Sequence, residues 1–368
     1  MSNPNPKAEG MFESLAILHL CSQPEVQPAR ADQLQSEVRK IVGMRGAEFS
    51  GLLSFADVQR TQVRTLDILA SATGLSTSER STVEQLAQVA RDRVRQALIG
   101  LNRVVTGLQR TGAQVLVIKS LDHWPDIGSD LDLFIEADSS EVCRILTQTL
   151  HATIEPQSWG DKLAGKWNFR IPGLEPLVEI HVNRLGQTGE QAQLPKRLLE
   201  RSITGEFGGF EFRVPAPEER IALATLQRMY RHFYVRLTDI VNITRLVRGS
   251  HVNFVELQKT ANTGSLWPGV STLLQIVSDY NTRYADAPFD LPTDVRVAAR
   301  FGDEVTYVGE RFLRVPMVPQ ATLLYVRQWA RTGAEHKYEA LLRLTLLPLL
   351  AAAAYLNLQF TGNDKGIW

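Results

Sequence analysis

The sequence contains little cysteine, since Cys21 and Cys143 are the two such residues among 368. They show neither the spacing of metal ligands nor the number needed for a disulfide framework. The first ten residues also lack the basic-then-apolar order of a signal peptide. These absences favour a reducing compartment, and we predict a cytoplasmic protein.

The sequence also has no surplus of charge of one sign. Forty basic and 40 acidic residues give a formal net charge of zero. Without an overall basic field, bulk nucleic-acid binding is not expected. One uncharged, almost entirely apolar segment, residues 344–356, is too short for the about 20 residues that cross a bilayer. We therefore predict no transmembrane segment and a buried C-terminal helix here, with a membrane-surface or partner-docking helix as the alternative.

The composition that remains is ordinary for a globular protein, with 44% hydrophobic and 22% charged residues, and the length allows two or three domains. We predict a helical N-terminal region over residues 1–110, a core over 111–215 and a C-terminal helical domain over 216–368. In the first region, Ser81–Glu84 has the S-x-x-E pattern of a helix-starting capping box.

Short apolar and β-branched segments predict the strands of the core. They cover residues 115–118, 130–136, 167–171, 177–182 and 210–214, and a helix is expected over 139–151. The predicted class is α+β, with a small mixed β-sheet between a helical N-terminal arm and a C-terminal helical bundle.

The motif Gly128-Ser129-Asp130-Leu131-Asp132 opens the strand over residues 130–136. Residues two apart in a strand point to the same face, so Asp130 and Asp132 would present adjacent carboxylates. Adjacent carboxylates repel each other unless a cation lies between them, and Mg²⁺ prefers oxygen ligands of this kind. The motif predicts a metal site for a phosphate substrate; the alternative is a solvated strand end.

A second informative strand, Leu177–Val182, places Glu179 and His181 on one face by the same alternation. An acid within an apolar strand costs free energy unless it is paired or binds a metal. If this strand lies beside Asp130 and Asp132, Glu179 becomes the third carboxylate of the site. The alternative is an edge strand whose polar face meets water.

These segments together resemble the nucleotidyltransferase fold of the DNA polymerase β superfamily, and most closely its uncharacterised bacterial nucleotidyltransferases. The resemblance rests on Val115–Lys119, Asp130-Leu-Asp132 and Glu179-Ile-His181, and extends loosely over residues 90–290. It implies Mg²⁺ bound by the catalytic residues Asp130, Asp132 and Glu179, with Glu179 doubling as a base.

The resemblance also implies a nucleotide-binding group formed by Lys119, Ser120, Gly128 and Ser129. A second basic group is expected on a helix. Arg228, His232 and Arg236 are spaced at i, i+4 and i+8, with Arg231 at the edge of the same face. A triphosphate would supply their counter-charge; the alternative is a solvated or carboxylate-paired helix face.

The predicted function is a Mg²⁺-dependent nucleotidyltransferase that moves a nucleoside monophosphate from an NTP, with ATP favoured, to a small-molecule acceptor. One alternative is a nucleotidyltransferase that modifies a protein. Another is a non-catalytic member that binds a nucleotide or a partner, because Ser120-Leu121 replaces the small-residue pair of the superfamily.

Overall fold

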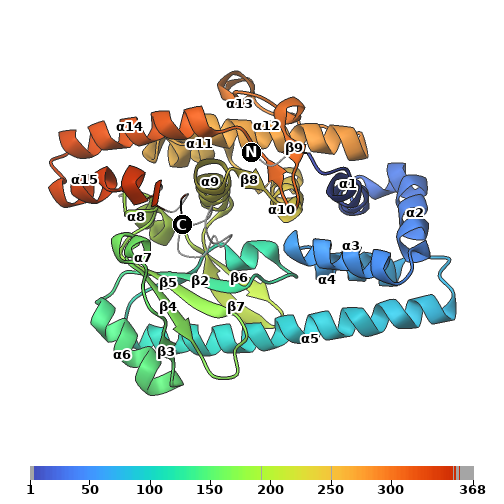
Figure 1. Ribbon diagram of the computed structural model, residues 1–368, viewed down its shortest axis with the longest axis horizontal. Helices are drawn as coiled ribbons and strands as arrows, with labels where there is room; N and C mark the ends of the chain where they lie inside the picture. Colours follow the sequence, from blue (N-terminus) through green and yellow to red (C-terminus); the bar gives the residue numbers. More distant parts are fainter. Residues whose placement is uncertain (1–3, 192, 250, 351, 354–355, 357–368) are drawn as a thin grey trace.

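The computed structural model describes residues 4–191, 193–249, 251–350, 352–353 and 356. The described residues up to about residue 108 are mostly helical, as expected. The helices are α1 (Pro6–Cys21), α2 (Gln27–Gly43), α3 (Ala47–Val58), α4 (Gln62–Ser71) and the long α5 (Thr77–Leu108). Figure 1 shows α5 running along one side of the molecule, beneath the sheet and beneath α3 and α4.

Helix α5 begins one turn earlier than the sequence pattern suggested. The capping box is formed by Ser76 and Glu79: the Ser76 hydroxyl accepts from the Glu79 amide, and the Glu79 carboxylate accepts from the Ser76 amide. The predicted start at Ser81–Glu84 is therefore wrong. Both tetrapeptides fit S-x-x-E. Ser76 precedes the first helical residue and caps it, whereas Ser81 lies inside the helix, where its neighbours' amides are already bonded.

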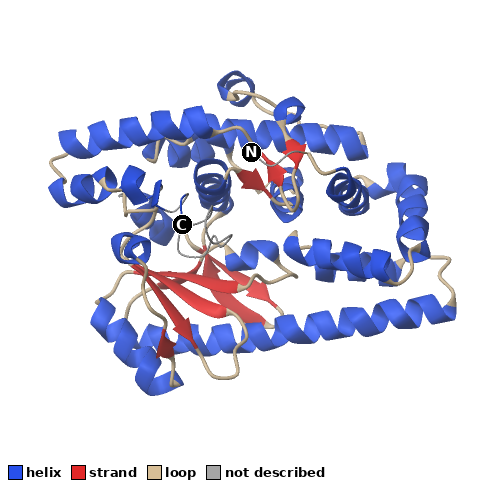
Figure 2. Ribbon diagram, viewed as in Figure 1, coloured by secondary structure: helices blue, strands red, loops and turns tan. Residues whose placement is uncertain are grey.

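The central sheet is mixed, which confirms the predicted α+β class. Its strands are β1 (Val115–Val117), β2 (Asp130–Ile135), β3 (Thr153–Ile154), β4 (Lys166–Arg170) and β5 (Leu177–Val182). They lie in the order β1-β2-β5-β4-β3, in which β2 and β5 are parallel and the other neighbours are antiparallel. Figure 2 shows the sheet with helices on both sides.

Further elements complete the core region. They are α6 (Ser139–Leu150), α7 (Trp159–Ala164), α8 (Leu194–Glu200) and the hairpin of β6 (Ile203–Phe207) and β7 (Phe210–Val214). The predicted strands and helix are present with shifts of one residue or so at their ends. The sequence analysis missed β3 and β6, because both are short and largely exposed and have no apolar periodicity.

The two faces of the sheet differ in what they bury. Leu131, Leu133 and Ile180 lie on the face that packs against α5 and α6. The opposite face carries Phe134 in a smaller apolar cluster with the α8 residues Leu194 and Leu198 and with Leu223. Strand alternation places the polar residues of β2 and β5 on this second face, beside the C-terminal helices.

The C-terminal half is helical but not continuously so. Its elements are α9 (Pro217–Gln227), a π-helical turn η3 (Arg228–His232), β8 (Tyr234–Val235), α10 (Leu237–Arg248), α11 (Phe254–Thr263), α12 (Trp267–Ala285), α13 (Thr293–Ala298), a 3-10 turn η4 (Asp303–Val305), β9 (Tyr307–Val308), β10 (Leu313–Arg314), α14 (Val318–Ala334) and α15 (Tyr338–Thr345).

A three-stranded sheet, ordered β8-β10-β9, interrupts the helices expected from residue 216 onward. The expectation of unbroken helices is wrong there. Strands of two residues leave no alternating pattern that could be read from the sequence. One hydrophobic core contains residues of α1–α4 together with residues of α9, α10 and α12. The division into 1–110, 111–215 and 216–368 stays a prediction.

The apolar segment 344–356 is not the buried helix that we predicted. Leu344 is buried, but Leu346, Leu349 and Leu356 are exposed. Residues 351, 354 and 355 of this segment lie outside the described residues. No helix within the described ranges is both long and apolar enough to cross a membrane.

Candidate metal and nucleotide site

The parallel pairing of β2 and β5 brings the two acidic motifs together. Asp132 lies directly opposite Glu179, and Phe134 lies opposite His181. The expected adjacency of Asp132 and Glu179 on one face is therefore confirmed. The carboxylates come from segments about 47 residues apart, and a parallel strand pair is what aligns them.

Asp132, Glu179 and His181 each offer a ligand atom, and these atoms lie within 4.8 Å of one another. His181 Nε2 is 3.0 Å from Glu179 Oε1 and 3.8 Å from Asp132 Oδ1. The imidazole was not among the predicted metal ligands, although the acid-x-His spacing was the signal that could have identified it. Two carboxylates and an imidazole form a donor set that fits a divalent cation.

Asp130 lies at the start of β2 on the same face but is not part of this three-residue cluster. Its side chain is exposed and accepts a hydrogen bond from the Ser129 hydroxyl at 3.2 Å. Partial burial raises the pKa of Asp130, and the charges of Asp132 and Glu179 raise it further. Like charges disfavour each other's ionised form, so the three acids repel one another unless a cation lies between them.

Two lysines neutralise the acidic cluster. Lys119 Nζ is 2.5 Å from Asp132 Oδ1 and 3.9 Å from Glu179 Oε1. Lys166 Nζ on β4 is 2.6 Å from Glu179 Oε2 and 3.4 Å from Asp161 Oδ1. Burial alone would raise the pKa of Glu179, but His181, Lys119 and Lys166 hold it well below its usual value. The Lys119 ammonium thus lies where a cation shared by both carboxylates would bind.

The segment after β1 positions Lys119. Its φ of +62° is in the left-handed region, and a 3-10 turn, η2 (Ser120–His123), follows directly. The Ser120 hydroxyl accepts from the Asp132 amide at 2.7 Å and donates to the Asp130 carbonyl at 3.3 Å. Ser120 is buried, and its hydroxyl holds the start of β2 in place. Leu121 is also buried and packs in the core below the sheet.

The expected basic stripe on one helix is wrong. Helix α9 ends at Gln227, Arg228 and His232 lie in the π-helical turn, and Arg236 lies after β8 as the residue that caps α10. Phe233 takes the left-handed conformation at the end of the turn, which ends any regular i, i+4 spacing. The backbone changes direction here because Tyr234 and Val235 pair with β10.

The cations nevertheless gather in space around His232. Burial, followed by the charges of Arg231, Arg228, Arg236 and Lys119, lowers the pKa of His232 to about 2. Arg228 is only 2% exposed, and its Nε lies 2.7 Å from Asp239 Oδ2. Arg236 lies over the rings of Tyr234 and Phe312, which are 5.7 and 5.3 Å from its Cζ.

The N-terminal region contributes an arginine that the sequence analysis missed. Arg60, between α3 and α4, donates to the Ser129 hydroxyl at 3.1 Å. Burial lowers the pKa of Arg60, and the charges of Asp57 and Asp130 partly oppose this shift. Gly128 is buried beside it. Within the described chain, the buried Nε–H groups of Arg60, Arg231 and Arg236 have no hydrogen-bond partner. No sequence signal links Arg60 to a motif 69 residues downstream.

Asp126, another acid of the motif region, points away from the site. Its carboxylate accepts from the amides of Val63 at 2.7 Å and Arg64 at 3.4 Å, in the first turn of α4. Burial raises the pKa of Asp126 to about 6. Asp126 therefore ties the N-terminal helices to the sheet and does not place its charge beside the phosphate-binding candidates.

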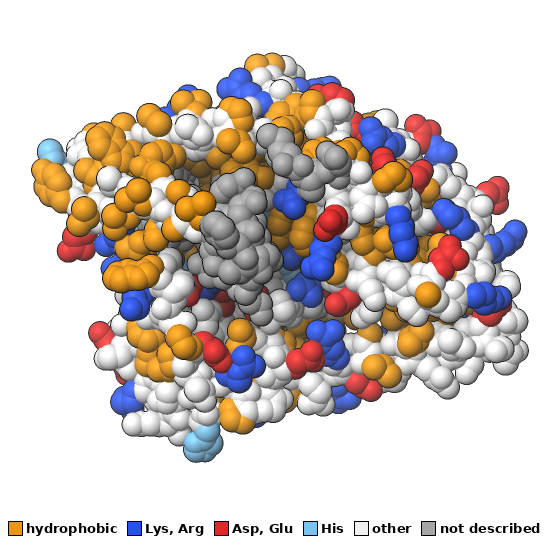
Figure 3. All heavy atoms as spheres, in the orientation of Figure 1, with side chains coloured by type: hydrophobic (Ala, Val, Ile, Leu, Met, Phe, Trp, Pro, Cys, Tyr) orange, Lys and Arg blue, Asp and Glu red, His pale blue; other side chains and the backbone are white. Residues whose placement is uncertain are grey.

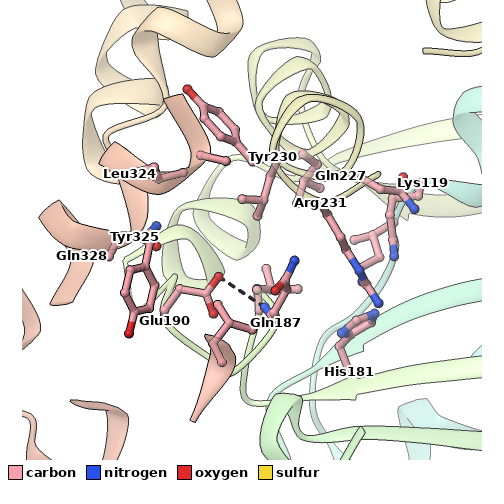
Figure 4. Close-up of a pocket in the computed structure, with 17 residues that line it drawn as sticks. Lys119, His181, Gln187, Glu190, Gln227, Tyr230, Arg231, Leu324, Tyr325 and Gln328 are labelled. Atoms are coloured by element: carbon pink, nitrogen blue, oxygen red, sulfur yellow. Dashed lines mark hydrogen bonds between the residues drawn. The ribbon is translucent and has the colours of Figure 1, made fainter. Parts of the chain in front are cut away.

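An open-sided pocket adjoins the cluster. Lys119, His181 and Arg231 lie at one end, and apolar residues such as Leu223, Leu226 and Leu324 form its walls. Figure 4 shows Arg231 extending from its helix toward His181. The pocket is concave and open on one side, and the space between its walls, with that open solvent included, is about 740 Å³.

No protein-family model and no curated protein matches the chain. A solved structure, that of an antigenic nucleotidyltransferase-like protein from Paracoccidioides brasiliensis, is similar to it with a TM-score of 0.32. The alignment has 19% sequence identity and covers 50% of this chain and 93% of that one. At this identity and TM-score the likeness adds nothing about activity or ligands, and the site itself must support any function.

Proposed function

We propose that this protein is a Mg²⁺-dependent nucleotidyltransferase that moves a nucleoside monophosphate from an NTP, ATP in the first instance, to a hydroxyl of a small molecule. The observation that carries the proposal is the pairing of Asp132 with Glu179 across β2 and β5, next to a group of buried cations. Acidic clusters and surplus arginines side by side are what a metal-bound polyphosphate requires.

The metal would be held by Asp132 and Glu179, with Asp130 or His181 completing the set. A divalent cation there would neutralise the carboxylates and polarise phosphate oxygens. Lys119 must turn away for this to happen. The Nε–H groups of Arg231 and Arg236 have no hydrogen-bond partner among the described residues and would be available to bind a phosphate.

In the proposed reaction, an acceptor oxygen attacks the α-phosphorus and forms a new P–O bond, while the bond from that phosphorus to the bridging oxygen breaks and pyrophosphate leaves. Arg231, Arg236 and Lys119 would bind the oxygens of the β- and γ-phosphates, where charge accumulates. Glu179 is deprotonated and can accept the hydroxyl proton, but its low pKa makes it a weak base while Lys166 and His181 contact it. A metal-ligand role for Glu179 is therefore the stronger part of the proposal.

The pocket beside Lys119 and His181 favours a small-molecule acceptor over a protein acceptor. Its concave shape and apolar walls suit a compact ligand. An acceptor protein would have to insert a side chain through the open side of the pocket. Transfer to a protein is the alternative that the experiment below also tests.

A binding-only protein is the second candidate, and a specific observation favours it. Lys119 and Lys166 already neutralise Asp132 and Glu179 without any metal. If Lys119 never leaves, the site would bind a nucleotide or another polyanion through its arginines and perform no transfer.

Incubation with [α-³²P]- and [γ-³²P]-labelled NTPs separates these candidates. The protein, with Mg²⁺, is supplied with either the low-molecular-mass or the protein fraction of a cell extract. Nucleotidyl transfer to a small molecule predicts α-label in a new small-molecule product, γ-label in pyrophosphate and loss of both with Asp132→Asn. Label on protein would support the protein-modifying variant. Saturable NTP binding without release of pyrophosphate in any fraction would support the binding-only candidate.

A further inference from the structure

The outward surface of α14 and α15 is apolar although it faces solvent. Eight large side chains on it are 39–68% exposed: Val318, Leu323, Val326, Trp329, Tyr338, Leu342, Leu346 and Leu349. We call this set the hairpin surface. Figure 3 shows hydrophobic side chains gathered over α14 and α15 on the viewed face. Contiguous patches of this kind on a soluble protein mark interaction sites.

The spacing of these residues places several of them on one face of each helix. Val326 and Trp329 are three apart on α14, and Leu342 and Leu346 are four apart along and just beyond α15. Such spacings place side chains on one face of a helix. The Trp329 indole N–H donates to the Thr345 hydroxyl at 3.2 Å, which joins the two helices into one layer.

The opposite side of the hairpin is already used. Leu324 of α14 is buried, and with Ala321 it lines the pocket beside the candidate site. The hairpin is therefore anchored through one face while the second apolar face has no cover among the described residues. A helix that is apolar on two faces is typical of a helix buried on both sides.

We infer that a second copy of this chain covers the hairpin surface, so that two hairpins form a four-helix bundle across a two-fold axis. For each fully exposed residue we take about 150–200 Å², in the lower part of the range that aromatic side chains bury. Eight such residues, a little over half exposed, offer roughly 700–900 Å² per copy, close to the about 800 Å² per partner of a stable interface. A two-helix layer is self-complementary in this way, and two-fold dimers are the commonest oligomers.

The charges beside the hairpin surface fit a protein partner better than an anionic membrane. Arg331 lies 3.6 Å and Lys337 2.6 Å from Glu335, and Arg343 lies 3.6 Å from Glu339. Helices that bind anionic lipid carry surplus lysine and arginine on the polar face. Here most of the cations are paired, which suits the polar rim of a dimer interface.

Sedimentation velocity and light scattering on the full chain test the inference. The wild type is expected at about 82 kDa, twice the chain mass of 41.2 kDa. Val326→Glu and Leu342→Glu place a charge in the centre of the surface without altering a residue that lines the pocket, and each should raise the dimer dissociation constant at least tenfold. Val89→Glu is the matched control, because Val89 is 71% exposed on the distant α5 and its substitution should leave the mass unchanged.

Hydrogen exchange on the wild type provides a reading that needs no variant. Amides of residues 318–350 should exchange more slowly at high than at low protein concentration, whereas those of α5 should not change. A wild type that stays at the monomer mass up to about 100 µM, with or without binding to lipid vesicles, would overturn the inference. A dimer that both substitutions leave intact would overturn it as well.

Discussion

Replacing Lys119 by Met tests whether its ammonium occupies the place of a divalent cation. Without metal, the variant leaves Asp132 facing Glu179 with no cation between them. The side chains of Lys119 and Asp132 are each 14% exposed, so their ion pair resembles a buried salt bridge more than a surface one. Loss of a hydrogen bond to a charged group costs about 1.5–3 kcal/mol.

This free energy corresponds to a measurable change in melting temperature. At about 2.1 cal/mol/K per residue, the 368-residue chain has an unfolding entropy near 0.8 kcal/mol/K. Lys119→Met should therefore lower Tm by about 2–4 °C in EDTA. The backbone conformation at residue 119 is equally demanding for Met and Lys, so the comparison isolates the charge.

Divalent metal should reverse the loss. In the wild type a divalent cation must displace the Lys119 ammonium group, whereas Lys119→Met has no ammonium group there to displace. If the variant binds Mn²⁺ or Mg²⁺ tenfold more tightly, saturating metal stabilises it by about 1.4 kcal/mol more than the wild type. Thermal unfolding with and without metal measures this difference. Lys162→Met is the control, because Lys162 lies over the Trp159 ring on α7 and away from the acids. Equal metal shifts in wild type and variant would refute the reasoning.

Substitutions at three further positions have defined outcomes. Glu179→Gln should reduce turnover more than NTP affinity, measured by steady-state kinetics and calorimetry, because the arginines are untouched; equal loss of both would make Glu179 structural. Asp126→Ala should lower the free energy of unfolding in urea by about 1–3 kcal/mol, because two amides at the start of α4 lose their acceptor, and Asp126→Asn should cost less. Burial, aided by the charge of Arg64, lowers the pKa of His19 to about 3, so its contribution to stability is present above pH 6.5 and is lost as the pH falls toward 3. Between pH 7 and 5 the wild type should therefore lose about 2 kcal/mol more than His19→Gln, and parallel pH profiles would contradict this assignment.

The parts of the fold that could be predicted are those with strong local patterns. The strand before Lys119 is a short, continuous apolar run, and the Asp130-x-Asp132 and Glu179-x-His181 strands show a readable alternation. Their pairing followed from the resemblance. The faces of β2 and β5 are consequently as expected.

The basic group could not be placed correctly, because its spacing fits a helix that the chain does not form. Arg228, Arg231 and His232 lie in a π-helical turn that ends when Tyr234 joins a two-residue strand, and the partner strand is about 80 residues downstream. Pairing with a distant strand decides the local structure here, and the sequence pattern around Arg236 does not predict that pairing.

The contact of Arg60 with Ser129 and that of Lys119 with Asp132 were beyond sequence reasoning for a related reason. Arg60 reaches Ser129 through the packing of the N-terminal helices against the C-terminal ones, and that packing is a property of the whole core. Lys119 was expected to face phosphate, and it instead contacts Asp132. Electrostatics explains this contact, because an ammonium group and the carboxylates beside it attract one another.

The most direct test of the proposed metal and nucleotide site is a crystal structure with Mn²⁺ and a non-hydrolysable NTP. The diffraction data should be recorded at a wavelength where manganese gives an anomalous signal. We expect an anomalous peak about 2.0–2.3 Å from oxygens of Asp132 and Glu179, with the Lys119 ammonium moved onto a phosphate and Arg231 or Arg236 contacting the triphosphate. No peak at these carboxylates, with Lys119 still bound to Asp132 while the nucleotide occupies the site, would contradict the nucleotidyltransferase proposal.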